Sequence, residues 1–251
     1  MTLLTIQNLR RSFGQLVAVD GVSFAVEPGE LVGLIGPNGA GKTTVFNCIS
    51  GTIPPDGGSV TFDGDDVTGA APPALAHRGL VRTFQQTREL STMTVKDNML
   101  LPWRDHPGER AVNALTRSEG VAESERAARE RAQTLLEVFD LEDMVDEYAS
   151  SLSGGQRKLL ELARALMLDP KLLLLDEPFA GVNPTLTQRI AAHIKEFNDE
   201  GLTLLIIEHE LETLTELVDR LIVLANGAVL ATGTPNEILN NDRVIDAYLG
   251  R

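Results

Sequence analysis

Residues 36–43 read Gly36-Pro37-Asn38-Gly39-Ala40-Gly41-Lys42-Thr43, which fits the pattern G-x-x-x-x-G-K-[ST]. The apolar stretch Leu31–Ile35 precedes this octapeptide and predicts a strand. A helix is expected to follow from Lys42 to Ser50 and to end at Gly51. A strand, a glycine-rich loop and a helix in this order predict a phosphate-binding loop in an α/β fold.

The residue types of the octapeptide suit phosphate binding. The glycines allow backbone N–H groups to turn towards phosphate oxygens, and the helix N-terminus adds partial positive charge. We expect the Lys42 ammonium to reach the β- and γ-phosphates and the Thr43 hydroxyl to bind Mg²⁺. The alternative is a strand-to-helix turn without a ligand, which would need neither Lys42 nor Thr43.

A second apolar run ends in two carboxylates. Leu172–Leu175 is apolar at every position, as expected for a central parallel strand buried on both faces, and Asp176 and Glu177 follow it. Ligands of open parallel sheets bind at the carboxyl ends of the strands. We therefore expect Asp176 to reach Mg²⁺ and Glu177 to polarise an attacking water. Alone, the same run could simply end in a solvated turn.

The remaining pattern predicts two kinds of region. Short strands separated by turns are expected in the N-terminal part, and strands alternating with helices from Lys171 to Ile207 indicate a parallel sheet with crossover helices. Residues 87–148 instead show mixed charges at helical spacing, with Ala127–Phe139 as the clearest helix. Trp103–Glu119 is interpreted as a loop or loosely packed insertion.

Composition excludes several classes of partner. The net charge of −14 argues against nucleic acid, which is bound through basic patches. No run of 18 apolar residues is present, so we expect any membrane link to pass through another chain. The single cysteine, Cys48, rules out an internal disulfide and lies in an apolar stretch typical of a buried thiol.

A second candidate anion site precedes the predicted helix Arg157–Leu168. Ser153 and Gln156 fit a capping box, and a simple helix cap is one interpretation. The other is a phosphate site, because Gly154-Gly155 presents N–H groups beside the Ser153 hydroxyl at the positive end of a helix. Two cradles for one γ-phosphate suggest that two surfaces close on one nucleotide.

The segment Leu152–Gln156 resembles the signature motif of ATP-binding cassette (ABC) proteins, and the other motifs follow in the order of that family. The resemblance implies that ATP and Mg²⁺ are bound between two cassettes arranged head to tail. It implies that Phe13 stacks on adenine, that Gly36–Thr44 is the Walker A loop including Thr44, and that Gln85 is the Q-loop glutamine. His209 matches the switch histidine.

Roles are carried over residue by residue. Catalytic roles are implied for Glu177, His209, Lys42 and Gln85, and metal contacts for Thr43, Gln85 and Asp176. Nucleotide contacts are implied for Phe13, Gly36, Pro37, Asn38, Gly39, Ala40, Gly41, Lys42, Thr43, Thr44, Ser153, Gly154, Gly155 and Gln156. One position departs from the family, because Asn183 stands where many cassettes carry aspartate. That difference puts cross-subunit coupling through this residue in doubt.

The resemblance also implies an architecture. We expect a P-loop ATPase core with a parallel sheet, an N-terminal antiparallel β subdomain and an inserted helical subdomain. The core would comprise residues 1–86 and 165–251, and the helical subdomain residues 87–164. Partners would be transmembrane permease subunits, a second cassette in a homo- or heterodimer and, indirectly, a solute-binding protein, with the chain peripheral on the cytoplasmic face of the membrane.

Within the family, the motifs favour import of branched-chain amino acids. The segment Glu177–Pro184 and the C-terminal tail resemble both these importer cassettes and lipopolysaccharide-export cassettes, whereas Ile207–Glu210 and the insertion Trp103–Glu119 favour the importers. A urea or amide importer stays open. So does a non-transport ABC ATPase, although such proteins usually fuse two cassettes or insert a long coiled coil. A P-loop metabolic kinase would not need Leu152–Gln156.

Overall fold

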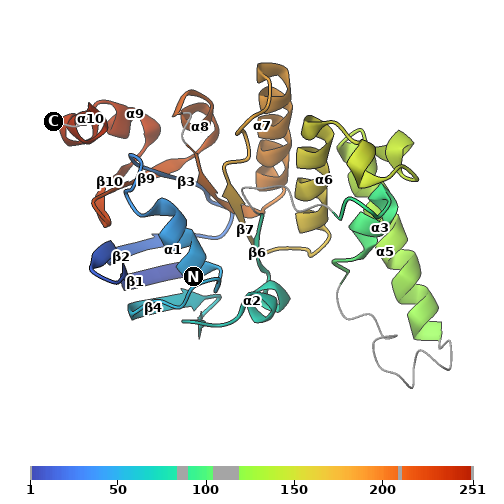
Figure 1. Cartoon of the computed structure of the whole chain (residues 1–251), viewed down its shortest axis with the longest axis horizontal. Coiled ribbons are helices and arrows are strands. Elements are labelled where there is room, and N and C mark those ends of the chain that lie inside the picture. The colour runs from blue at the N-terminus through green and yellow to red at the C-terminus, as the bar shows by residue number, and fades with distance from the viewer. Residues whose placement is uncertain (1, 84–89, 104–118, 209–210, 250–251) are drawn as a thin grey trace. The chain divides into compact units, whose positions relative to one another are not determined.

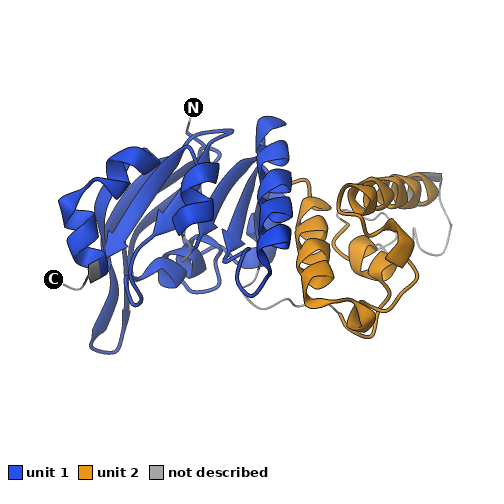
Figure 2. Ribbon diagram, turned by 90° about the horizontal axis from the view of Figure 1, so that it is seen from above, with its two compact units in different colours: residues 1–85, 171–251 blue, residues 86–170 orange. Residues whose placement is uncertain are grey.

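The computed structural model describes residues 2–83, 90–103, 119–208 and 211–249 (Figure 1). The chain divides into two compact units: unit 1 comprises residues 1–85 and 171–251, and unit 2 residues 86–170 (Figure 2). The expected boundary between residues 164 and 165 would cut a helix, α6, which runs from Gly154 to Leu166. The contacts place this boundary after Pro170.

Unit 1 contains an antiparallel sheet in the order β2-β1-β4-β5. Strand β1 (Leu4–Phe13) forms a hairpin with β2 (Leu16–Val26), and its other edge pairs with β4 (Gly57–Phe62). The short β5 (Asp65–Asp66) pairs with β4. This sheet is the expected N-terminal antiparallel subdomain.

The second sheet of unit 1 has the order β10-β9-β3-β8-β7-β6. Parallel pairing joins β9, β3, β8, β7 and β6, and β10 runs antiparallel to β9. Every residue of β3, β7 and β8 is buried, which explains their continuous apolar sequences. The strands are β3 (Leu31–Ile35), β6 (Leu80–Arg82), β7 (Leu172–Asp176), β8 (Thr203–Ile207), β9 (Arg220–Ala225) and β10 (Ala228–Gly233).

The described helices of unit 1 connect these strands or follow them. One hydrophobic cluster contains side chains of both sheets and of α1, so the antiparallel subdomain and the parallel sheet share a core. The phosphate loop follows β3 and precedes α1, so residues of this shared core lie on both sides of it. The helices are α1 (Lys42–Ile49), α2 (Pro72–Arg78), α7 (Pro184–Asp199), α8 (Leu211–Leu217), α9 (Pro235–Leu239) and α10 (Asp242–Leu249).

Unit 2 is helical over the residues that the structure describes. Helix α5 (Glu119–Val138) packs against α3 (Val95–Leu100) and α6 (Gly154–Leu166), with 3-10 turns at Glu142–Met144 (η2) and Ala149–Ser151 (η3). The apolar side chains of Leu135, Leu136 and Phe139 are all buried. The helix begins before the predicted Ala127, at Glu119.

Several elements were not predicted, among them α2 and β6. Helix α2 begins with two prolines, and β6 has three residues, too few to show a period. Of these, β6 is important for the site, because it forms the edge of the parallel sheet beside β7, which carries Asp176. The α/β fold class, with its antiparallel subdomain and inserted helices, is otherwise confirmed.

Candidate active site

The predicted phosphate loop lies between β3 and α1. Helix α1 begins at Lys42, and its N-cap residue Gly41 makes no side-chain hydrogen bond to the first turn. The side chain of Asn38 and the backbone of Gly39 are exposed, while Ala40 is buried against the core. The first-turn N–H groups are therefore not occupied by a capping side chain, as a phosphate-binding helix end requires.

Glycine is required at the two ends of this loop. Gly36 has φ of 149°, and a Cβ atom there would lie 2.2 Å from the Leu224 carbonyl oxygen. Gly41 has φ of 100°, and a Cβ atom would lie 2.4 Å from the Ala18 carbonyl oxygen. Both contacts are with backbone atoms that cannot turn aside. The loop is therefore braced by chain segments on either side of it in sequence.

Two further contacts complete this bracing. The Gly227 N–H donates to the Ala40 carbonyl at 3.1 Å, and the Gly227 carbonyl accepts from the Asp20 N–H at 2.8 Å. Near the C-terminus, burial raises the pKa of Tyr248 to about 12, an effect that a hydrogen bond from the Gly36 backbone opposes. Residues of β2 and of the β9–β10 turn thus support the loop.

Lys42 lies buried beneath the loop. Its Nζ donates to the carbonyls of Gly36 at 2.6 Å and Pro37 at 3.2 Å. Burial lowers the pKa of this ammonium group, and the carboxylate of Glu177 opposes the shift. The electrostatic interaction places the predicted lysine and the predicted general base in one neighbourhood of unit 1.

Asp176 ends β7 and is buried at the carboxyl edge of the parallel sheet. Its Oδ2 accepts a hydrogen bond from Arg82 Nη2 at 2.6 Å, forming a buried ion pair. Arg82 was not singled out in the sequence. The only signal was an arginine directly after the apolar pair Leu80-Val81, and three residues of β6 gave no period to place it.

Glu177 follows in a backbone conformation unusual for its type. Its φ is 51°, in the left-handed region, while its N–H donates to the Ile207 carbonyl at 3.0 Å. Strained backbone of this kind is concentrated at functional sites. A buried carboxylate that was not predicted, Glu208, accepts from the Phe179 N–H at 2.8 Å. Glu208 and Ile207 therefore hold the segment after β7 against the end of β8.

Phe13 is at the end of β1, beside the hairpin turn, and 44% of it is exposed. The Arg11 guanidinium lies 5.1 Å from the centre of its ring. Arg11 is itself held by Asp56 Oδ1 at 2.7 Å. An exposed aromatic ring with a cation on one face is a suitable platform for a planar base.

In unit 2 the predicted capping box is present at the start of α6. The Ser153 hydroxyl accepts from the Gln156 N–H at 3.2 Å, and the Gln156 side chain accepts from the Ser153 N–H at 2.9 Å. Ser153 and Gly154 are exposed, and a Cβ atom on Gly154 would meet no atom within 4 Å. The segment is therefore a capped helix end that faces open space.

These features agree with the comparisons. Residues 19–180 match the family model described as ABC transporter, and residues 228–251 match one described as branched-chain amino acid ATP-binding cassette transporter. The probable branched-chain amino acid transport ATP-binding protein LivG of Methanocaldococcus jannaschii is 40% identical, with 100% of this chain and 98% of the relative covered. The high-affinity branched-chain amino acid transport ATP-binding protein BraF of Pseudomonas aeruginosa is 41% identical over 99% and 98%.

The chain belongs to the ATP-binding subunits of the branched-chain amino acid family of ABC transporters.

Solved structures of such cassettes have the same fold. A nucleotide-free ATP-binding cassette from an ABC transporter aligns with a TM-score of 0.85 at 40% identity, covering 100% of both chains. The ADP conformation of MJ1267, an ATP-binding cassette of an ABC transporter, aligns with a TM-score of 0.85 at 38% identity over 100% of both. This cassette therefore binds ATP and hydrolyses it to power transport, together with permease subunits.

The donor set of the site fits Mg²⁺ rather than a metal held by protein alone. The described residues hold no group of three or more His, Cys, Asp or Glu side chains placed around a metal. Thr43, exposed at the start of α1, and Asp176 supply oxygen donors. Mg²⁺ usually takes one or two protein oxygens and completes its shell with water and phosphate. The residues present fit that pattern.

Three predicted features are not placed. Gln85 and His209 lie outside the described residues, as does most of the insertion Trp103–Glu119. Within the part of the chain that the structure describes, no helix is long and apolar enough to cross a membrane.

Proposed function

We propose that this chain is the ATPase of an importer for branched-chain amino acids and acts at the cytoplasmic face of the membrane. The observation that carries this proposal is the full-length similarity to LivG and BraF, joined to the match of residues 228–251 to the branched-chain amino acid model. The same chain carries the phosphate loop and the carboxylates that ATP hydrolysis needs.

In this proposal the loop Gly36–Thr44 binds the triphosphate, and Phe13 stacks on adenine. Lys42 exchanges its bonds to the Gly36 and Pro37 carbonyls for bonds to the β- and γ-phosphate oxygens. Burial makes this exchange favourable, because it strips water from the ammonium and leaves it in need of an anionic partner.

The carboxylates take separate roles. Thr43 and Asp176 hold Mg²⁺, which neutralises charge on the phosphates when bound. Glu177 orients the attacking water and accepts its proton. From the family resemblance we assign Gln85 to the metal and His209 to the γ-phosphate.

A second cassette completes the site. We assign Ser153, Gly154, Gly155 and Gln156 to the γ-phosphate of the opposing subunit. The exposure of Ser153 and Gly154 supports this assignment. A hydroxyl can accept one hydrogen bond and donate another, so Ser153 can cap α6 and still donate to a phosphate oxygen.

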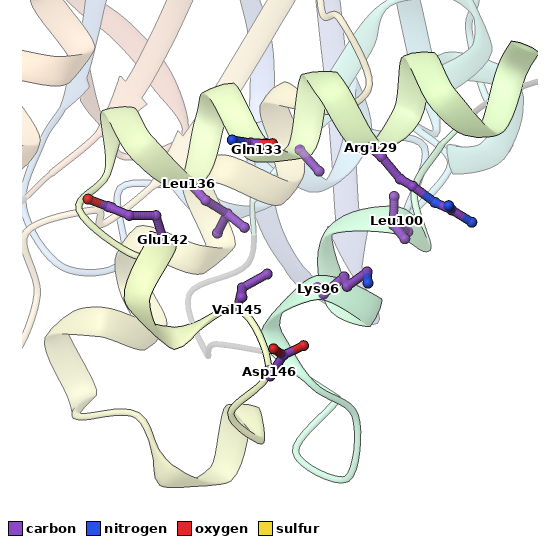
Figure 3. Close-up of a pocket in the computed structure, with 9 residues that line it drawn as sticks. Lys96, Leu100, Arg129, Gln133, Leu136, Glu142, Val145 and Asp146 are labelled. Atoms are coloured by element: carbon purple, nitrogen blue, oxygen red, sulfur yellow. The ribbon is translucent and has the colours of Figure 1, made fainter.

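A permease segment is assigned to unit 2. Between α3, α5 and the chain after η2 lies a hollow of about 400 Å³ (Figure 3). Leu100, Leu136 and Val145 give it an apolar lining. Lys96, Arg129, Glu142 and Asp146 line it with charges of both signs. This mixture suits an amphipathic helix end of a permease, which needs apolar burial and charged partners. In the same unit, Leu90 is 40% exposed although its backbone is held by the buried Asn98 of α3.

The decisive experiment is Glu177→Gln. We expect ATP binding to persist and turnover to be lost, because the amide cannot accept the proton of water, so ATP should trap a dimer visible by size-exclusion chromatography. Glu200→Gln, an exposed carboxamide substitution at the end of α7, serves as the matched control. Hydrolysis at a near-normal rate by the Glu177 variant would remove Glu177 from this role.

Coupling is tested at Leu90. Leu90→Ala should leave the basal ATPase of the isolated chain unchanged and lower permease-stimulated ATPase and uptake of branched-chain amino acids in reconstituted membranes. The basal and stimulated rates of Met93→Ala are measured beside those of Leu90→Ala. Met93 is half-buried, and its carbonyl accepts a hydrogen bond from the Ala149 N–H. A proportional fall of basal and stimulated rates for Leu90→Ala would show local packing instead.

A further inference from the structure

Arg82 occupies the end of the edge strand β6, where the site described above leaves it without a role. Parallel pairing of β6 with β7 sets Arg82 opposite Leu174, two residues before Asp176. Its Nη2 lies 2.6 Å from Asp176 Oδ2, and the two side chains are only 8% and 2% exposed. Such deep burial strengthens the interaction and restricts both groups to one geometry.

The other amino group of Arg82 binds α1. Nη1 donates to Asn47 Oδ1 at 2.7 Å and to Ser50 Oγ at 3.0 Å, and the guanidinium lies 5.7 Å from the centre of the Phe46 ring. Helix α1 is the one whose N-terminus forms the phosphate loop. One planar guanidinium therefore connects the carboxylate at the end of β7 with that helix, which the point charge of a lysine cannot do.

The Asp176 carboxylate is held on one side only. Arg82 binds Oδ2, and the Asp176 N–H reaches the Thr83 hydroxyl at 3.5 Å. Among the residues that the structure describes, Oδ1 accepts no hydrogen bond. The next residue after Arg82 also joins the strand, since the Thr83 N–H donates to the Leu174 carbonyl at 3.0 Å.

We propose that Arg82 is a positioning residue for the magnesium ligand. By binding Oδ2 and α1 together, it fixes the Asp176 carboxylate relative to the phosphate loop and leaves Oδ1 for the metal shell. This inference rests on the proposed role of Asp176. It adds a residue that acts through Asp176 and touches neither nucleotide nor metal.

The test measures metal binding directly. Mn²⁺ is titrated into the ADP complex of the full chain and followed by electron paramagnetic resonance, and ADP affinity is measured separately with EDTA. Arg82→Lys and Arg82→Met should weaken Mn²⁺ binding by about tenfold or more, the usual cost of losing a partner of a metal ligand. Metal-free ADP affinity should change by less than about twofold, because in this proposal Arg82 acts on the metal ligand and not on the nucleotide.

Two further variants separate positioning from folding. Arg220→Met removes an arginine that binds Glu30 through two contacts, at 2.6 and 2.8 Å, at the opposite, amino-terminal ends of β9 and β3. It should lower the melting temperature without changing Mn²⁺ affinity. In the Asp176→Asn background, Arg82→Met should cause no further loss, because its route to the metal is already removed.

Each result decides a different claim. Unchanged Mn²⁺ affinity in both Arg82 variants, or an equal loss in Arg220→Met, overturns the positioning role. An undiminished effect of Arg82→Met in the Asp176→Asn background overturns it as well. Unchanged Mn²⁺ affinity in Asp176→Asn alone rejects the metal ligand of the proposed function. If Arg82→Met does not fold, the test rests on Arg82→Lys, which keeps the positive charge but cannot bind Asp176 and α1 at the same time.

Discussion

Helices α1 and α6 both begin next to glycines and both match phosphate-binding motifs, yet their first turns differ. At α1 the N-cap is Gly41, in a left-handed conformation and without a side-chain bond. At α6 the N-cap is Ser153, in an extended conformation and with a complete capping box. The first helix end depends on a ligand for its hydrogen bonds, whereas the second satisfies part of its own.

This difference suggests a division of labour. The end of α1 adds a buried lysine and offers N–H groups that only an anion would satisfy, as expected of the primary triphosphate site. The end of α6 is stable without a ligand and presents its remaining donors to open space, as expected of a surface that meets ATP only when a second cassette arrives. The next three predictions test this contrast.

The largest effect is expected at the α1 end. Lys42→Ala removes a charged hydrogen-bond donor worth about 1.5–3 kcal/mol, so ATP affinity should fall by about tenfold or more. Because burial lowers the pKa of Lys42, the charged ammonium costs folding free energy at neutral pH; that cost falls as pH rises through the folded pKa and is gone above the ordinary value of 10.5. Calorimetric titration with ATP checks the loss of affinity, and an unchanged affinity would contradict the role of Lys42.

A smaller loss is expected at Phe13, which shows how much affinity lies outside the phosphate loop. Phe13→Ala should weaken ATP by about 1–3 kcal/mol, the range for stacking of one base. Replacement by tyrosine or tryptophan should restore binding. If ATP affinity held while the melting temperature fell, Phe13 would be a packing residue of the hairpin and not an adenine platform.

The smallest effect is expected at the α6 end and concerns stability. Two substitutions of Ser153 distinguish its role as a helix cap from its role as a phosphate contact. Ser153→Ala should lose about 0.5–2 kcal/mol of stability, whereas Ser153→Asp keeps an equally good cap. Both remove the hydroxyl donor, and aspartate adds repulsion towards a phosphate. ATP binding by the isolated chain should be unchanged in both, and ATP-dependent dimerisation in the Glu177→Gln background should be lost in both. A dimer that forms with Ser153→Asp would contradict the γ-phosphate assignment.

The phosphate loop and the end of β7 could be predicted from sequence because their chemistry lies in continuous runs. Residues 36–43 contain the loop, and Leu172–Asp176 contains both the strand and its carboxylate. The partner of that carboxylate could not be predicted. Arg82 meets Asp176 only because β6 and β7 are neighbours in the sheet, although the two residues are 94 positions apart in sequence.

Asn183, by contrast, could be singled out from the sequence, and the structure adds what it does locally. It was noted as a departure from the usual aspartate, and the structure adds a local role: its side chain caps α7 by accepting from the Leu186 N–H at 2.9 Å. Together with Pro184 in the first turn, this cap fixes the start of α7. Asparagine and aspartate cap helices about equally well, so the cap itself does not distinguish them.

The bracing of the phosphate loop has a consequence for how the protein is made. A Cβ atom on Gly36 or Gly41 would meet the backbone of Leu224 or Ala18, and Gly227 joins Ala40 to Asp20, so the conformation of the loop depends on residues outside 36–43. During synthesis the loop and the residues Ala18 and Asp20 leave the ribosome early, but Leu224 and Gly227 are added only with the last part of the chain. Chains that end before residue 224 lack part of this frame, so we expect nucleotide to stabilise completed chains and not these shorter ones.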